Sequence, residues 1–317
     1  AGVTAAQGYD GQSSWENPAM LHLKPLSPGF GLEASGVDLS DPLSDAAFTE
    51  IEDAFFDGQV LAFRHQQLTP LEFLAFARRF GRPEPHVIDQ FHHPDDPNIL
   101  ILSNVEIDGE PQGLSDAGTY FHTDYSYLAV PARATMLYSI EVPELGGETL
   151  FANQYAAYDD LSAAMKRKID PLIAIHHYGN RKVDEGAART AASTLTDEQK
   201  QKMPLITHPV VRRHPVTGEK ALYAVSGSSY GIVGMPDAEA VALLDELAAH
   251  ATQPKYLLSF TYGVGDLVIW DNASLLHSAT LVDPQYARTL WRITVKEPAP
   301  EGHAEAVLAS TFVHRGM

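Results

Sequence analysis

The residues best suited to chemistry in this chain are two histidines and an aspartate that could share one metal ion. His122 and Asp124 form a His-x-Asp pair in TYFHTDYSYLAV, which begins at residue 119 and is rich in residues that favour a β-strand. Side chains two positions apart on a strand project from the same face, about 6 to 7 Å apart. His277 follows the strand-like segment LVIWDN and is the candidate third ligand. Two imidazoles and one carboxylate leave three neighbouring positions of an octahedral ion open, as in non-haem Fe(II) oxygenases.

The chain contains a second His-x-Asp triplet, His93-Pro94-Asp95. This triplet lies in a segment from 82 to 96 that is rich in prolines and acidic residues, which is typical of a loop. A loop lacks the alternation that aligns two ligands on one face of a strand. We therefore predict a surface loop at this triplet and a metal site at the other.

Two arginines near the end of the chain match the open positions of such a metal site. An α-keto acid occupies two of those positions through its carboxylate and keto oxygens, and O2 takes the third. The distal carboxylate of 2-oxoglutarate then needs a cation, and a guanidinium binds a carboxylate through two hydrogen bonds. Arg288 and Arg292 share one face of the strand-like segment RTLWR. The alternative is a solvent-exposed strand end, but burying arginines among Leu, Trp and Ile without an anion is costly.

Strands and helices mix along the chain in an order that favours an antiparallel double sheet rather than a parallel one. Apolar spacing, cap residues and β-favouring runs locate these elements. Helices are predicted over 44–58, 69–81, 156–169 and 235–252, and strands over 59–65, 98–104, 172–179, 256–262, 265–272 and 288–297, with further short strands within 22–45 and a hairpin over 208–225. The charged, Ala-rich stretch that ends near residue 202 is expected to be helical or mobile.

Composition excludes several classes of function. The chain has 317 residues, with 22 Lys and Arg against 41 Asp and Glu, and its formal charge of -19 disfavours nucleic acid and anionic membranes as partners. It contains no cysteine, so a thiolate nucleophile, a disulfide and a cysteine-ligated metal are all excluded. Any metal must therefore bind to His and carboxylate.

The sequence also predicts a simple domain organisation and a location. Residues 1–20 are small and polar and are expected to form a flexible arm, followed by one domain over 21–317. No apolar run is long enough for a membrane helix, and the start of the chain lacks the pattern of a signal peptide, so a cytoplasmic protein is expected. A homo-oligomer is compatible with the sequence.

Several motifs together give the chain a specific resemblance. The motifs are FARRFG at 76–81, FHTD at 121–124, GGETLFAN at 146–153, HPVVRRHPVTG at 208–218, and WDN at 270–272, followed by the candidate histidine and arginines. With these motifs the chain resembles the Fe(II)/2-oxoglutarate-dependent dioxygenases of the TauD/TfdA family over nearly its whole length. The resemblance implies a β-rich (α+β) fold with a double-stranded β-helix, or jelly roll, flanked by helices.

The resemblance also implies a reaction and roles for residues. It implies Fe(II), 2-oxoglutarate and O2 as cofactor and co-substrates, with hydroxylation of a small organic acid and release of succinate and CO2. Collapse of the product follows where the hydroxylated carbon bears a heteroatom. By this resemblance, His122, Asp124 and His277 correspond to the iron ligands. Thr149 and Arg288 correspond to the groups that hold the distal carboxylate of 2-oxoglutarate. Arg292 corresponds to a residue near the co-substrate and the acidic group of the substrate.

The expected substrate residues depart in part from the taurine dioxygenase pattern. His86 resembles a substrate-contacting loop histidine, but Ser228 stands where a pocket Phe is expected and Gly118 replaces a polar residue. Tyr125, together with Tyr120, Tyr127 and Tyr230, could build a larger aromatic pocket. A sulfonate, a sulfate ester or an aryloxyalkanoate is therefore expected rather than taurine itself.

Three functions other than hydroxylation by a dioxygenase are also compatible with parts of the sequence. Some isonitrile-forming relatives also have Tyr directly after the Asp, although the GGETLFAN block favours the hydroxylases. The same two imidazoles and carboxylate could hold Zn or Ni in a hydrolase or isomerase cupin, but such a site does not need a pair of arginines that binds a dicarboxylate. A metal-free jelly-roll binding module would leave the ligand set unexplained.

Overall fold

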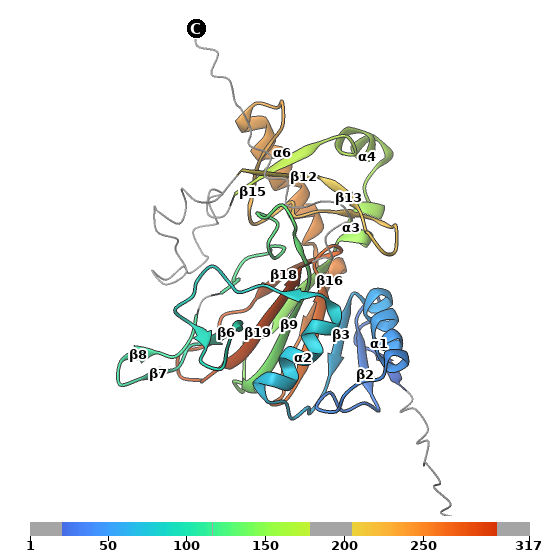
Figure 1. Cartoon of the computed structure of the whole chain (residues 1–317). Helices are drawn as coiled ribbons and strands as arrows, with labels where there is room; N and C mark the ends of the chain where they lie inside the picture. Colours follow the sequence, from blue (N-terminus) through green and yellow to red (C-terminus); the bar gives the residue numbers. More distant parts are fainter. Residues whose placement is uncertain (1–20, 116, 178–204, 297–317) are drawn as a thin grey trace, which may run out of the picture.

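The computed structural model describes residues 21–115, 117–177 and 205–296, and within them it is rich in β-strands. The main sheet has nine strands and is antiparallel except where β2 and β3 run parallel (Figure 1). Its strands, in spatial order, are β1 (His22–Pro25), β2 (Leu32–Ser35), β3 (Val60–Phe63), β17 (Leu267–Asp271), β9 (Ala132–Glu141), β19 (Thr289–Lys296), β6 (Asp96–Ser103) and β5 (His92–His93), with β4 (Arg82–Pro83) paired to β19. The predicted antiparallel arrangement is confirmed.

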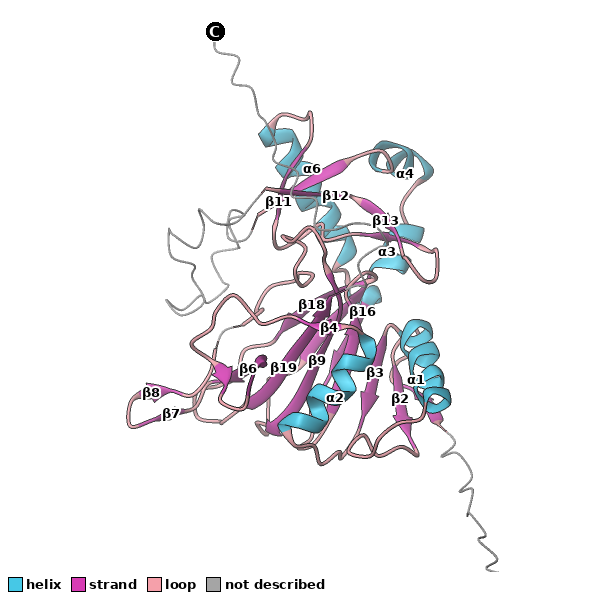
Figure 2. Ribbon diagram, in the orientation of Figure 1, coloured by secondary structure: helices cyan, strands magenta, loops and turns pink. Residues whose placement is uncertain are grey.

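Two helices cover one face of the main sheet, as Figures 1 and 2 show. Helix α1 (Asp45–Gly58) begins after the cap residue Ser44, and α2 (Pro70–Phe80) begins after Thr69, whose side chain forms a reciprocal capping box with Glu72. Their phenylalanines pack against alternate residues of the sheet, such as Leu267. Both helices were predicted from their caps and apolar spacing, and both are confirmed.

A second sheet packs against the opposite face of the main sheet. It contains β16 (Leu257–Phe260), β10 (Thr149–Asn153) and β18 (Leu275–Ala279), in that order. Phe151 and Phe260 from this sheet share a core with Val268 and Trp270 of β17. Because successive residues of a strand face opposite sides, β17 contributes to the cores on both faces of the main sheet.

A third group of elements lies above the two sheets in Figure 2, and its core includes Ala152 of β10 and Leu276 of β18. It includes the sheet β12-β11-β15, the hairpin β13-β14 and helix α6, whose buried leucines pack on this sheet. The bounds are α3 Gln154–Asp159, α4 Ala163–Ile169, β11 Ile173–His176, β12 Ile206–Pro209, β13 Val211–Arg213, β14 Lys220–Leu222, β15 Ser229–Ile232, α6 Asp237–Ala251 and the 3-10 turn Pro254–Tyr256. A small hairpin of β7 (Glu106–Ile107) and β8 (Glu110–Pro111) projects at the left of Figure 1.

Two local predictions need correction. The predicted helix over 156–169 is two short helices, because Ser162 caps α4 after α3 has ended at Asp159. The predicted loop over 82–96 contains two strands of two residues each, β4 and β5. The predicted arm at 1–20 and the predicted Ala-rich stretch ending near residue 202 fall outside the described residues.

Candidate metal and co-substrate site

The His-x-Asp pair does not lie on a strand, contrary to the prediction. His122 forms an isolated bridge with His277 of β18, in which the two residues exchange backbone hydrogen bonds of 3.0 and 2.9 Å. Asp124 begins a turn, and Tyr125 after it has a positive φ of 54°. The chain leaves the bridge because the Asp124 N–H donates to the side chain of Asn272 at 3.3 Å instead of to a neighbouring strand. β-Favouring residue types therefore occupy a turn here, since tertiary hydrogen bonds outweigh propensity.

The three side chains nevertheless converge. The Nε2 atoms of His122 and His277 each lie 3.5 Å from an oxygen of Asp124, and one ligand atom from each residue lies within 4.8 Å of the other two. Two ligand atoms at right angles around one ion, each about 2.1 Å from it, are about 3 Å apart. Among the described residues, this is the one group of three or more His and acidic side chains with such spacing.

The protonation states suit a divalent metal. Burial, followed by the nearby His122, lowers the pKa of His277 well below its ordinary value. Burial alone would raise the pKa of Asp124, but the charge of Arg292, with smaller contributions from the histidines, holds it well below its usual range. The Nδ1 of His122 lies 2.8 Å from the Tyr120 carbonyl, which can only accept, so the tautomer of the neutral ring is the one with its lone pair on Nε2. Neutral imidazoles and an ionised carboxylate are the forms that bind metal.

A buried hydroxyl network orients the Asp124 carboxylate, and no sequence motif marks the threonine at its centre. Thr135 of β9 donates to Asp124 Oδ2 at 2.6 Å and accepts from the Asn272 side-chain amide at 2.9 Å. Thr294 of β19 lies 3.2 Å from the same hydroxyl. Asn272 belongs to the WDN motif at 270–272, so this motif could have pointed to a residue that supports the site.

Two glycines with positive φ lie against His122. A Cβ at Gly227 (φ 81°) would come within 2.7 Å of the His122 Cβ, and one at Gly118 (φ 70°) within 2.8 Å of the His122 ring. Gly118 stands where the taurine dioxygenase pattern has a polar residue. The glycine has a physical reason in this chain, because any side chain there would displace the imidazole.

Arg288 and Thr149 both line the pocket that contains the three convergent side chains, and both lie near Tyr262. Arg288 directly precedes β19 and is only 8% exposed, and its backbone N–H donates to Asn104 at 2.8 Å. The Thr149 hydroxyl is 2.8 Å from the hydroxyl of Tyr262, and burial raises the pKa of Tyr262 to about 12. Tyr262 was not predicted. A buried guanidinium beside two hydroxyls is suited to a carboxylate.

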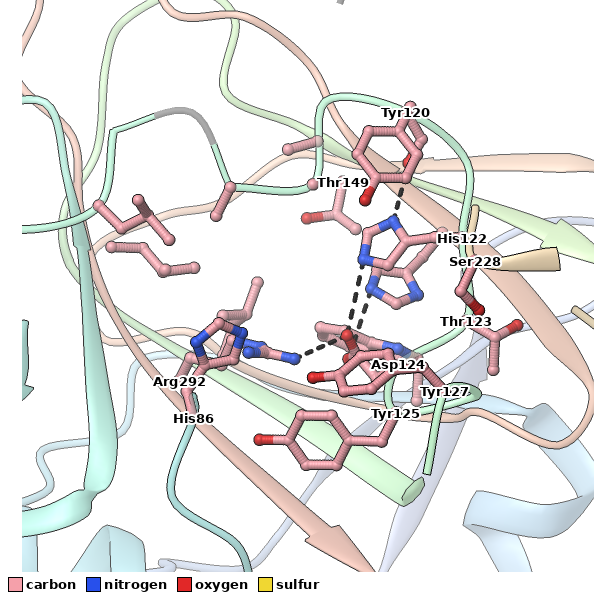
Figure 3. A pocket seen from close by; sticks show the side chains of 18 of the residues that line it. His86, Tyr120, His122, Thr123, Asp124, Tyr125, Tyr127, Thr149, Ser228 and Arg292 are labelled. Atoms are coloured by element: carbon pink, nitrogen blue, oxygen red, sulfur yellow. Dashed lines mark hydrogen bonds and ion pairs between the residues drawn. The ribbon is translucent and has the colours of Figure 1, made fainter. Parts of the chain in front are cut away.

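Arg292 lies near His86 and Tyr125, with its side chain 11% exposed, and projects toward Asp124 (Figure 3). Its Nη2 lies 2.7 Å from Asp124 Oδ1, and its guanidinium carbon is 5.9 Å from the centre of the Tyr125 ring. Burial, followed by the charge of Arg292, lowers the pKa of His86 to about 3. The Tyr125 hydroxyl donates to the Glu84 carbonyl at 3.1 Å.

The remaining sequence-predicted residues divide between the pocket and other places. Ser228, Tyr120 and Tyr127 line the same pocket, and Figure 3 shows Ser228 and Tyr120 on the side opposite His86. Tyr230 lies in β15 and does not line it. The second His-x-Asp triplet is outside the pocket, where the His93 ring packs on Trp291.

The comparisons with known proteins agree with this geometry. Residues 22–294 match the family model described as "Taurine catabolism dioxygenase TauD, TfdA family". The chain belongs to the TauD/TfdA family. It is 34% identical to the alpha-ketoglutarate-dependent 2,4-dichlorophenoxyacetate dioxygenase of Burkholderia sp. (strain RASC), over 85% of this chain and 92% of that protein. Pentalenolactone F synthase of Streptomyces arenae is 31% identical, over 90% and 99% of the two chains.

One similar solved structure contains a metal ion and a bound small molecule. The crystal structure of AAD-2 in complex with Mn(II) and N-oxalylglycine superposes with a TM-score of 0.74 at 30% identity, covering 89% of this chain and 99% of that one. The predicted family and enzyme class are therefore confirmed, and the chain is a dioxygenase rather than a hydrolytic cupin or a metal-free binding module. None of the helices in the described ranges is long and apolar enough to span a bilayer.

Proposed function

We propose that this TauD/TfdA family member is an Fe(II)- and 2-oxoglutarate-dependent dioxygenase that hydroxylates a small organic anion. One observation carries the proposal: the His122, Asp124 and His277 ligand atoms and the guanidinium groups of Arg288 and Arg292 all border a single pocket. When bound, Fe(II) and 2-oxoglutarate supply the oxidising power that converts O2 and a substrate C–H bond into a hydroxyl group, with succinate and CO2 as by-products.

The charges of the loaded pocket favour an anionic substrate. Fe(II) and the two arginines bring four positive charges, whereas Asp124 and 2-oxoglutarate bring three negative ones. Burial lowers the pKa of His86, which therefore adds no charge at neutral pH. An unbalanced charge in a buried site is costly, so a substrate with one carboxylate, sulfonate or sulfate group would complete the balance.

Each side chain has a separate role in this proposal. His122, Asp124 and His277 would hold the metal, and Arg288 with Thr149 would bind the distal carboxylate of 2-oxoglutarate through paired hydrogen bonds. The lowered pKa values of His277 and Asp124 favour a neutral imidazole and an ionised carboxylate at neutral pH, which are the forms that these roles need. The cavity walls then exclude water from the reacting atoms.

Arg292 and His86 would bind the acidic group of the substrate. A guanidinium has five N–H donors, and the contact with Asp124 uses one nitrogen of Arg292. The Nδ1 of His86 accepts from the backbone N–H of Ile88 at 3.1 Å, so the proton of the neutral ring is on Nε2. Arginine would supply charge, and histidine would supply an uncharged donor.

The metal and co-substrate roles can be tested without substrate. Fe(II) and 2-oxoglutarate are added to the protein without oxygen, and the visible charge-transfer band of the chelate is measured. The wild type should give the band, His122→Ala should abolish it, and Arg288→Ala should shift its appearance to higher 2-oxoglutarate concentration. A wild type without the band, or an unchanged band in His122→Ala, contradicts the proposal.

The substrate class needs a separate experiment. Sulfonates, sulfate esters and aryloxyalkanoates are supplied under air, and succinate formation is compared with product formation. We expect at least one class to couple the two, and Arg292→Gln to raise the KM for the acid. A preference for the uncharged esters of the same acids would refute the anion-binding role of Arg292.

The finer architecture is also part of the proposal. The main sheet and the β16-β10-β18 sheet, facing each other across a shared core, support a double-stranded β-helix within one domain. Side chains from both sheets then reach the cavity between them, as Arg292 of β19 and Thr149 of β10 do. The cytoplasmic location stays a prediction.

A further inference from the structure

A second cluster of buried polar side chains touches the pocket only through Ser228. Ser228 lines the pocket, and its hydroxyl lies 2.6 Å from the hydroxyl of Ser126 and 3.2 Å from Nδ1 of His176. Ser126 and His176 are both fully buried. The metal and co-substrate roles described above do not use any of these three side chains.

The backbone holds Ser228 in place beside the metal ligands. Gly227 packs against His122, and the His177 N–H donates to the Ser228 carbonyl at 3.0 Å. Figure 3 shows Ser228 next to His122, on the side of the pocket opposite Arg292. A substrate whose acidic group contacts Arg292 would therefore extend its other end toward this wall.

The position of the proton on His176 can be assigned from its surroundings. Burial lowers the pKa of His176 to about 3, so the ring is neutral and carries one N–H at neutral pH. Its Nε2 is buried without a hydrogen-bond partner among the described residues. A proton on Nε2 would be an unpaired buried donor, whereas a proton on Nδ1 is donated to Ser228.

The remaining hydrogen bonds of the cluster then follow. The Ser126 hydroxyl lies 3.4 Å from the Thr123 carbonyl, which can only accept, so the proton of Ser126 is directed there. In this arrangement Ser228 donates its own proton to Ser126, across the 2.6 Å between the two hydroxyls. Its oxygen accepts from His176 with one lone pair and keeps one lone pair for the pocket.

We propose that Ser228, oriented by His176, accepts a hydrogen bond from a hydroxyl or amine N–H of the substrate. This inference rests on the proposed function and narrows it to small organic acids that carry a hydrogen-bond donor at the end remote from the acidic group. Ser228 is the specificity-determining contact, and His176 is a positioning residue that acts through it. A neighbouring donor would pair with the free lone pair, whereas an ether or methyl group would leave that lone pair unpaired.

The first test concerns the assigned proton and needs no substrate. In 15N-labelled protein, the two ring nitrogens of His176 are assigned by NMR with His176→Asn as the reference that lacks the signals. We expect a proton on Nδ1 and none on Nε2 at pH 7. A proton on Nε2 overturns the proposal, because Ser228 would then donate to the ring.

The second test measures selectivity by calorimetry, on protein loaded with Mn(II) and 2-oxoglutarate without oxygen. The probes are 4-hydroxyphenoxyacetate against 4-methoxyphenoxyacetate and 3-hydroxypropanesulfonate against 3-methoxypropanesulfonate. The wild type should bind the hydroxy acid of at least one pair more tightly, and Ser228→Ala should reduce that preference by about threefold to tenfold, the effect of one neutral hydrogen bond. Comparing each pair in both proteins removes the difference in size between the two acids.

Three further variants complete this test. His176→Phe should lose the preference, and His176→Asn should keep it, because an Asn amide can donate from nearly the position of Nδ1. Ser259→Ala, a matched change at an exposed residue of β16, should leave it unchanged. An unchanged preference in Ser228→Ala overturns the proposal and leaves the proposed function standing. Failure of all four acids to bind the wild type overturns both.

Discussion

Thr135→Val should weaken metal binding although residue 135 is not a metal ligand. The threonine is fully buried, and its hydroxyl donates to Asp124 Oδ2 at 2.6 Å while accepting from the Asn272 amide at 2.9 Å. Valine has nearly the same shape, so the change removes these hydrogen bonds without leaving a cavity. The carboxylate of Asp124 then loses the contact that fixes its rotation, and Arg292 becomes its main partner.

The magnitude follows from the two hydrogen bonds. One to a charged group contributes about 1.5 to 3 kcal/mol, and an unpaired buried amide costs about 1 to 3 kcal/mol. These effects overlap because one hydroxyl makes both contacts, so the metal-free protein should lose about 2 to 3 kcal/mol of unfolding free energy. Loss of a group that orients a ligand typically weakens metal binding about 10-fold to 100-fold.

The assay is a titration of metal-free protein with Mn(II), in which free Mn(II) is followed by electron paramagnetic resonance. Thr135→Ser keeps the hydroxyl and should restore most of the affinity, and Thr261→Val at an exposed position is the matched control. Urea unfolding at pH 7 measures the stability of each variant. Wild-type Mn(II) affinity in a folded Thr135→Val protein would refute the orienting role of this hydroxyl.

Three further predictions follow from other contacts. Gly227→Ala places a methyl group within 2.7 Å of the His122 Cβ and should weaken Mn(II) binding at least 10-fold in the same titration, whereas unchanged affinity would show that the imidazole moves freely. Arg288→Lys keeps the charge but loses the paired hydrogen bonds, so calorimetry should show about 10-fold weaker 2-oxoglutarate binding, and equal affinity would contradict the carboxylate role. Burial lowers the pKa of His176 to about 3 and of His208 to about 4. Each ring stays neutral in the folded protein, whereas the same histidine in the unfolded chain gains a proton as the pH falls below about 6.5. The unfolding free energy should therefore drop by about 2 kcal/mol per histidine from pH 7 to pH 5, and a flat profile in urea unfolding would contradict this.

The sequence was most reliable where a local rule acts on neighbouring residues. Ser44 and Thr69 predicted two helix starts because a cap residue hydrogen-bonds to backbone N–H groups in the next turn. The same locality explains the hairpin of β13 and β14, whose turn residues lie between the strands. The turn at Asp124 was missed because distant residues such as Asn272 hold it.

For the candidate site, the sequence by itself determined the types of chemical group that are available. The absence of cysteine leaves His and carboxylate as the possible metal ligands, and the His-x-Asp pair, His277 and the two late arginines supply the candidate metal-binding and anion-binding groups. Side-chain chemistry is a property of the residue and does not depend on the fold.

Only the tertiary structure decided how these groups are held and in which protonation state. Thr135, Tyr262 and His176 have no motif of their own, and each has a hydrogen-bond partner more than 50 positions away in the chain. Hydrogen bonds and desolvation act over a few ångströms in space, whereas a motif records only separation along the chain. The roles of these three residues therefore depend on packing that no local pattern contains.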